Sequence, residues 1–151
     1  MTRLAIISAA ALFVTASGAL AQAVVPDPTV TPGSVRTTNL GEICFEGTGQ
    51  HRHRHDDMAI MESYGLAPES RPEFEIDHLV PLELGGSDDL ANLWPEPRIS
   101  VEPEWNAERK DELENALHAM VCDGSLDIEV AQKAIIDDWT EAWRLYVARS
   151  S

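Results

Sequence analysis

An aspartate and a histidine stand side by side at Asp77 and His78, and together they offer two groups that metal-assisted hydrolysis uses. A carboxylate is a hard oxygen ligand for a divalent cation, and an imidazole can take a proton from water near neutral pH. Neighbouring residues of a strand point to opposite faces, so the two side chains can share one ion only if the backbone bends. Pro81 follows closely and supplies a reason for such a bend. On residue types alone, the pair could equally be a structural feature of a strand end.

Two asparagines follow at positions that could complete such a site. Asn92 lies beyond a Gly-Gly turn in a segment rich in proline. Its amide could accept a bond from an imidazole, hold the loop by bonding to backbone, or simply favour the turn. Asn106 stands at the entry of an expected helix, where it could be a neutral oxygen ligand or the helix cap. Residue types and order therefore predict one site for a single divalent cation.

The elements that would position these residues begin with an alternation of polar and apolar side chains over residues 73–84, which predicts strand structure. Residues 82–84 alternate again after Pro81, so we expect a bent pair of short strands. The glycines and aspartates of residues 85–89 predict a turn. The prolines of residues 90–104 predict a loop of fixed shape rather than a helix.

Helical periodicity dominates the last third of the chain. Residues 106–121 carry an apolar stripe at helical spacing. A second amphipathic helix is expected to begin after a cap at Ser125 or Asp127 and to run to about Ala148. The short link between the two helices predicts that they pack as antiparallel neighbours.

The first part of the chain divides into three segments. Residues 1–23 combine a basic start, an apolar stretch and small-x-small exit sites, which predicts a secretory signal peptide rather than a membrane anchor. Residues 24–41 are rich in proline, threonine and serine and predict an extended, irregular lead-in. The remaining residues, 42–151, suit one domain, with a short helix expected over residues 57–65.

Cys44 and Cys122 are the two cysteines of the chain. Export would bring them into an oxidising compartment, so we expect one disulfide between them. Two buried free thiols are the alternative. Because the loop between these residues is long, the chain-entropy model gives such a disulfide roughly 4–5 kcal/mol of stabilisation.

The stretch from Glu75 to Trp94 resembles the HNH endonucleases of the ββα-metal superfamily, in which Asp-His is followed by Pro, Gly-Gly and Asn-Leu. Over nearly the whole chain after the leader, the sequence also resembles a group of exported bacterial proteins. The resemblance implies an α+β fold in which a ββα-metal unit is joined by a further C-terminal helix and preceded by the irregular lead-in. It implies hydrolysis of phosphodiester bonds in a nucleic acid.

The resemblance also implies a role for each matching residue. Asp77 would be the first metal ligand, His78 the general base, and Asn92 the residue that orients the histidine and the loop. The third motif position is normally a histidine or asparagine at the start of the helix, and here Asn106 stands there with Asp111 behind it. The cofactor would be one divalent cation, Mg²⁺, Mn²⁺ or Zn²⁺. The cations nearest to the motif, expected to hold a phosphate, are Arg98, Arg109 and Lys110, with Arg71 as a further candidate.

The charge balance of the chain argues against nucleic-acid binding. Eleven basic residues against 26 acidic ones give the chain a formal net charge of −15. Nucleic-acid-binding proteins usually carry a basic surface, and an acidic one repels phosphate polymers. A non-catalytic exported binding module on the same scaffold is therefore the alternative function. It predicts weak cation binding and no effect of replacing His78.

A run of alternating histidines and arginines, residues 51–55, allows three interpretations. Alternate histidines of a strand share a face, so His51, His53 and His55 could bind a metal ion such as Zn²⁺. The run could instead be a solvated loop. It could also supply the basic surface that a phosphate backbone requires.

Overall fold

The structure, a computed structural model, describes residues 24–46, 54–99 and 104–148, so the predicted leader lies outside the described residues. The fold is α+β, as predicted, with one antiparallel two-stranded sheet in the described part of the chain. The elements follow in this order: η1 (Glu42–Glu46), α1 (Asp57–Ser63), η3 (Pro68–Glu73), β1 (Phe74–His78), η4 (Leu82–Leu84), η5 (Leu90–Asn92), β2 (Leu93–Pro97), α2 (Ala107–Cys122) and α3 (Ile128–Tyr146). Among the described residues, no helix has the length and apolar character needed to cross a bilayer.

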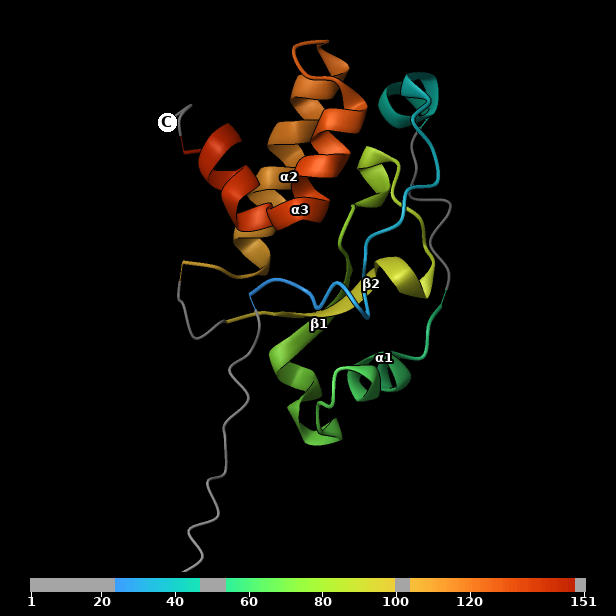
Figure 1. Ribbon diagram of the computed structural model, residues 1–151, viewed down its shortest axis with the longest axis vertical. Helices are drawn as coiled ribbons and strands as arrows, with labels where there is room; N and C mark the ends of the chain where they lie inside the picture. Colours follow the sequence, from blue (N-terminus) through green and yellow to red (C-terminus); the bar gives the residue numbers. More distant parts are fainter. Residues whose placement is uncertain (1–23, 47–53, 100–103, 149–151) are drawn as a thin grey trace, which may run out of the picture.

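The sheet separates two groups of helices. α2 and α3 pack side by side on one side of it, and α1 lies on the other, next to β2 (Figure 1). The main core forms between the sheet and the α2–α3 pair. Its fully buried side chains include Trp94 of β2, Leu113 and Leu117 of α2, and Ile135 and Trp139 of α3.

The two long helices begin where their capping residues predict. The Asn106 side chain accepts a hydrogen bond from the Arg109 amide, and the Asp127 side chain accepts from the Glu129 and Val130 amides. Of the two caps considered for α3, the structure selects Asp127. The predicted packing of α2 and α3 as antiparallel neighbours is confirmed. α3 is kinked at Asp138, where the backbone is extended and the side chain caps the following turn at Thr140.

The short helix α1 is also confirmed. Asp56 caps it by accepting bonds from the amides of Met58 and Ala59. Gly65 follows the helix with a φ of +66°, a left-handed conformation that glycine adopts without strain. Ile60 and Met61 are the buried side chains of α1.

Strand β2 corrects the prediction that residues 90–104 form a proline-braced loop. The backbone bonds that flank its pairing with β1 run from the Leu79 amide to the Asn92 oxygen and from the Arg98 amide to the Glu73 oxygen. In an antiparallel pair, the backbone hydrogen bonds between the strands fall on alternate residues. The even-numbered residues of β2 therefore direct their backbone N–H and C=O groups toward β1. Pro95 and Pro97 occupy the odd positions, where the missing amide hydrogen would point away from the ladder.

The expectation of a second strand at residues 82–84 is wrong, because η4 is a single 3-10 turn. Gly86 lies against the loop that precedes the turn, and a Cβ at Gly86 would lie 1.9 Å from the carbonyl oxygen of Val80. The Gly86 amide donates to the carbonyl oxygen of Pro81, which closes the turn. The chain therefore reverses over Pro81–Gly86 and has no length left for a strand.

The lead-in is extended, as predicted, and it is bonded along the loop that carries Gly85 to Asn92. Val35 bridges Gly86, and the amides of Arg36 and Thr37 donate to the carbonyl oxygen of Gly85. A Cβ at Gly85 would lie 2.1 Å from the carbonyl oxygen of Thr37, so only glycine permits this approach. The lead-in is consequently part of the packed domain.

Candidate functional site

Asp77 and His78 are the last two residues of β1 in sequence, and they point to opposite faces of the sheet. Asp77 faces α2, where its Oδ2 lies 2.6 Å from Nζ of Lys110. His78 faces the side of α1, where its Nε2 lies 2.6 Å from Oδ1 of Asp88. The predicted bend that would bring both side chains around one ion is absent, because β1 stays extended and paired with β2 through His78. The two residues therefore belong to two separate clusters.

His78 borders a pocket of about 460 Å³, which we call the His78 pocket. It lies at the start of α1, and its polar walls include Arg54, His55 and Asp88. The side chains of His78 and Asp88 are each 5% exposed, and His55 is 21% exposed. Met58, Ile76 and Leu93 supply apolar lining. A pocket of this size accepts a small ligand or one residue of a polymer.

Asp88 lies between the two imidazoles. Its Oδ1 contacts Nε2 of His78, and its Oδ2 lies 3.1 Å from Nε2 of His55. A carboxylate accepts hydrogen bonds, so Nε2 of His78, at 2.6 Å from Oδ1, carries the proton. In the Nε2–H tautomer, Nδ1 holds the lone pair that accepts a proton. Asp88 thus fixes the orientation of the His78 ring.

On the other face, Lys110 of α2 is fully buried and holds three groups together. Its Nζ donates to Oδ2 of Asp77, to the carbonyl oxygen of His78 at 2.8 Å, and to a carboxylate oxygen of Glu114. Glu96 of β2, 1% exposed, lies in the same cluster. We refer to Asp77, Glu96, Lys110 and Glu114 as the Lys110 cluster.

Burial and charge act against each other in the Lys110 cluster. Burial alone would raise the pKa of Asp77, but attraction to the Lys110 ammonium holds that pKa below its ordinary value. Burial would lower the pKa of Lys110, yet the surrounding carboxylates raise it well above the ordinary value. Asp77 and Lys110 therefore form a charged pair inside the protein.

The remaining carboxyl groups of the Lys110 cluster favour their protonated forms. Burial raises the pKa of Glu114 to about 8, and the nearby charge of Asp77 adds to this. Burial also raises the pKa of Glu96 well above its ordinary value, with Asp77 and Glu114 as further causes. One fully buried lysine faces three carboxyl groups, of which Glu96 is buried and the side chains of Asp77 and Glu114 are 24% and 12% exposed, and the raised pKa values of Glu96 and Glu114 favour their protonated forms.

Asn92 is entirely buried and bonds to backbone on three segments. Its Oδ1 accepts from the amides of Val80 and Ser34, at 2.9 and 3.3 Å. Its Nδ2 donates to the carbonyl oxygens of Val80 and Ser87, at 2.8 and 2.7 Å. Of the roles considered for this amide, the structure supports the bonding of the loop. Because the bonded loop leads from His78 to Asp88, Asn92 is a positioning residue.

The other predicted site residues do not enter the His78 pocket. Asn106 uses its side-chain oxygen to cap α2, which is the alternative to a metal-ligand role. Arg98 pairs with Glu75 at 2.8 Å. Arg109 pairs with Glu112 and lies over the ring of Trp143, at 4.8 Å from its centre.

Lys110 is buried and cannot reach a phosphate at all. Burial removes Lys110 from the expected phosphate-binding set, whereas Arg98 and Arg109 lie at the surface outside the His78 pocket and stay predictions. Arg71 is likewise engaged, by Asp57 of α1. Within the described part of the chain, the arginine that lines the pocket is Arg54.

The sequence reasoning missed Asp88 and the pairing of His55 with it. Asp88 was accounted for as a turn residue, ten positions after His78. Its signal was the acidic pair that follows Gly-Gly in the loop leading back to the sheet. His55 belongs to the histidine run, and of that run His51, Arg52 and His53 lie outside the described residues.

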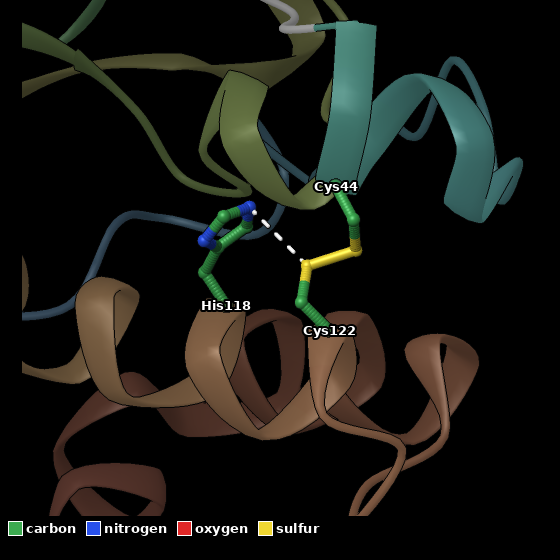
Figure 2. A group of neighbouring side chains, drawn as sticks. All are labelled: Cys44, His118 and Cys122. Carbon is green, nitrogen blue, oxygen red and sulfur yellow. Dashed lines mark hydrogen bonds between the residues drawn. A yellow bond between two sulfur atoms is a disulfide. The ribbon is translucent and has the colours of Figure 1, made fainter.

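The predicted disulfide is confirmed between Cys44 of η1 and Cys122 at the end of α2. Figure 2 shows His118, one helical turn before Cys122, with its ring directed at the disulfide. Its Nε2 lies 3.6 Å from Sγ of Cys122 and 3.2 Å from the carbonyl oxygen of Ile43. Ligand atoms of Cys44, His118 and Cys122 all lie within 4.8 Å of one another, so the group could hold a metal ion. The disulfide consumes both thiolates, and only the reduced protein offers this ligand set.

His55, His78 and Asp88 do not form such a set in the described residues, although Asp88 contacts both imidazoles. Comparison of the chain with family models, with curated proteins and with solved structures found no match in any of the three.

Proposed function

We propose that this protein is an exported, HNH-like phosphodiesterase that acts on nucleic acid in the His78 pocket. The observation that carries the proposal is the contact of 2.6 Å between Nε2 of His78 and Oδ1 of Asp88, inside a pocket that Arg54 also lines. An oriented imidazole in a pocket that a guanidinium group also lines is suited to proton removal next to a phosphate. The Cys44–Cys122 disulfide is compatible with an extracellular location.

The divalent cation that the HNH resemblance implies does not fit at its expected position. The carboxylate of Asp77 accepts a hydrogen bond from Lys110, and the amide oxygen of Asn106 accepts the bond that caps α2. A cation there would have to displace a buried ammonium group and would meet its positive charge. The proposed chemistry is therefore assigned to the protein's own side chains.

In this proposal, His78 removes a proton from the attacking hydroxyl through Nδ1. Asp88 holds the ring in the required tautomer and stabilises the imidazolium that forms. Arg54 compensates part of the charge that develops on the phosphate oxygens. Asn92 and the Lys110 cluster fix the backbone on either side of His78.

The test is cleavage of fluorescent single-stranded RNA and DNA oligonucleotides by the purified protein with its disulfide intact. His78→Ala should lower the cleavage rate by about 100- to 10,000-fold, the usual contribution of a general base. His118→Ala is the matched control, because His118 lies at the disulfide and outside the pocket. Circular dichroism confirms that each variant is folded. Absence of cleavage by the folded wild-type protein would contradict the proposal.

The second candidate is the non-catalytic binding module. The pairing of Asp77 with Lys110 favours it, because a metal position of the HNH scaffold is given over to an internal ion pair. In that case the oligonucleotides bind without being cut, and His78→Ala leaves binding unchanged.

A further inference from the structure

His55 supplies a second imidazole to the His78 pocket, and this imidazole contacts the same carboxylate, Asp88, that contacts His78. Its Nε2 is buried and lies 3.1 Å from Oδ2 of Asp88, and no hydrogen bond to it is found in the described residues. Without a proton, that nitrogen would direct its lone pair at a carboxylate. The contact therefore favours a proton on Nε2, as at His78.

The arrangement is one carboxylate with an imidazole on each oxygen. His78 comes from the end of β1, Asp88 from the loop after η4, and His55 from the segment before α1. The two imidazoles direct Nε2 at different oxygens of Asp88, His78 at Oδ1 and His55 at Oδ2. They stand on either side of Asp88 at the wall of one pocket. Two such groups can act as a base and an acid on one phosphodiester.

Resting on the proposed function, we propose that the pocket cleaves RNA by transphosphorylation, with His78 as the base and His55 as the acid. Nδ1 of His78 takes the proton of the ribose 2′-hydroxyl, and the 2′ oxygen forms a bond to phosphorus. The bond from phosphorus to the 5′ oxygen breaks, and His55, which enters the step as an imidazolium with its Nε2–H on Asp88, gives that oxygen the proton of Nδ1. The products are a 2′,3′-cyclic phosphate and a free 5′-hydroxyl. No water, metal or other co-reactant enters the balance.

The substrate class follows from the nucleophile. A 2′-hydroxyl is held next to its own phosphate, and such intramolecular placement replaces much of the activation that water would need. DNA lacks this hydroxyl, so two imidazoles alone would have to activate a free water molecule. The occupation of Asp77 by Lys110 removes the family's usual means of doing so.

The primary experiment uses a ribodinucleotide in excess EDTA, with the same dinucleotide carrying a single 2′-deoxy substitution as its matched control. We expect cleavage of the first to a 2′,3′-cyclic phosphate, and a rate at least 100-fold lower for the second. A requirement for added Mg²⁺, Mn²⁺ or Zn²⁺, or equal cleavage of the deoxy substrate, would overturn the two-imidazole mechanism while leaving the phosphodiesterase in place. No cleavage of any substrate by the folded protein would overturn both proposals.

The role of His55 is tested by changing the leaving group. His55→Ala should slow cleavage of the ribodinucleotide by about 100-fold or more. It should hardly slow uridine 3′-(p-nitrophenyl phosphate), because p-nitrophenolate leaves without a proton. His78→Ala should slow both substrates. Equal losses on both substrates for His55→Ala would show that His55 is structural and would overturn its assignment as the acid.

Discussion

Nζ of Lys110 lies 2.6 Å from Oδ2 of Asp77 and 2.8 Å from the carbonyl oxygen of His78. One side chain from α2 thereby holds both of the last two residues of β1. It contacts the side chain of one and the backbone of the other, so it can fix His78 without entering the pocket. The buried lysine therefore anchors the end of β1 from the face opposite the pocket.

Replacing Lys110 with methionine should be strongly destabilising. The change leaves the partly buried carboxylates of Asp77 and Glu114 without their counter-charge, and removing one partner of a buried pair costs about 3–5 kcal/mol. Urea unfolding followed by circular dichroism measures this loss. Lys133→Met is the control, because Lys133 is 72% exposed and pairs with Asp137 at the surface, where a pair contributes about 0–1 kcal/mol. Equal stabilities of the two variants would contradict the role given to Lys110.

The stability of the protein should decrease as the pH rises from about 5 to 9. The pKa of Glu114 is about 8 in the folded protein against an ordinary value of 4.5. A carboxyl group with a raised folded pKa contributes stability that is fully present below the ordinary value and is lost as the pH rises through the folded value. Glu96, whose pKa is also raised, acts in the same direction.

Urea unfolding at several pH values tests this dependence. Glu114→Gln should flatten the curve, because the amide can still accept from Lys110 and does not titrate. Glu62→Gln, at an exposed position of α1, should leave the curve unchanged. A wild-type protein that gains stability between pH 5 and 9 would argue against the protonated carboxyls of the Lys110 cluster.

The loop between His78 and Asp88 depends on Asn92. Asn92→Ala removes four hydrogen bonds to the backbone and leaves buried polar groups unpaired, at about 1–3 kcal/mol for each group that finds no substitute. We expect a loss of roughly 2–4 kcal/mol in urea unfolding. Asn115→Ala is the control, because Asn115 is exposed and bonds once, to Asp111 within α2. If cleavage survives Asn92→Ala unchanged in a folded protein, the loop does not position the two histidines.

The helices and the disulfide were predictable because local signals determine them. Asn106 and Asp127 cap α2 and α3 at the expected positions, and the apolar stripe of α3 is buried from Ile128 to Ala142. The expectation of export, together with the presence of two cysteines, predicted their pairing. The helix predictions required no knowledge of contacts between distant segments. The disulfide prediction required only that the two cysteines come together in the fold.

The site was predictable only in part. The strand signal at residues 73–84 located β1, but Pro81 was taken as a bend within a sheet, whereas it begins a turn after the strand has ended. Prolines argued against a strand at Leu93–Pro97, since only the register shows that Pro95 and Pro97 point away from the ladder. Whether Asp77 binds a cation or Lys110 depends on how α2 packs, and no local pattern encodes that.

The response of cleavage to salt should be the reverse of that of a basic nuclease. With a formal net charge of −15, the protein repels a polyanion, and added salt screens this repulsion. The KM for a long single-stranded RNA should therefore fall between about 10 and 100 mM NaCl, where the Debye length shortens from roughly 30 to 10 Å. A ribodinucleotide, which carries a single phosphate charge, is the control and should show little change. A KM for the polymer that rises steeply with salt would indicate an extended basic contact surface instead.

Reduction should convert the disulfide into a metal-binding group. In the reduced protein, Co²⁺ should bind Cys44, His118 and Cys122 and produce thiolate-to-cobalt charge-transfer absorption in the near ultraviolet. The oxidised protein and the reduced Cys44→Ser/Cys122→Ser double variant should show none. Circular dichroism must show that the reduced protein is still folded. Absence of the absorption in a folded, reduced sample would mean that His118 only packs against the disulfide.

The paired glycines Gly85 and Gly86 make the domain sensitive to a cut in the segment that packs against them. The backbone of residues 34–37 is pressed against Gly85 and Gly86 and bonded to Gly85, Ser87 and Asn92. A single peptide-bond cut in this segment, which does not line the His78 pocket, would remove backbone bonds that hold the loop carrying Asp88. Limited proteolysis within residues 34–37 should therefore disorder the His78 pocket without cutting the chain at any residue that lines it.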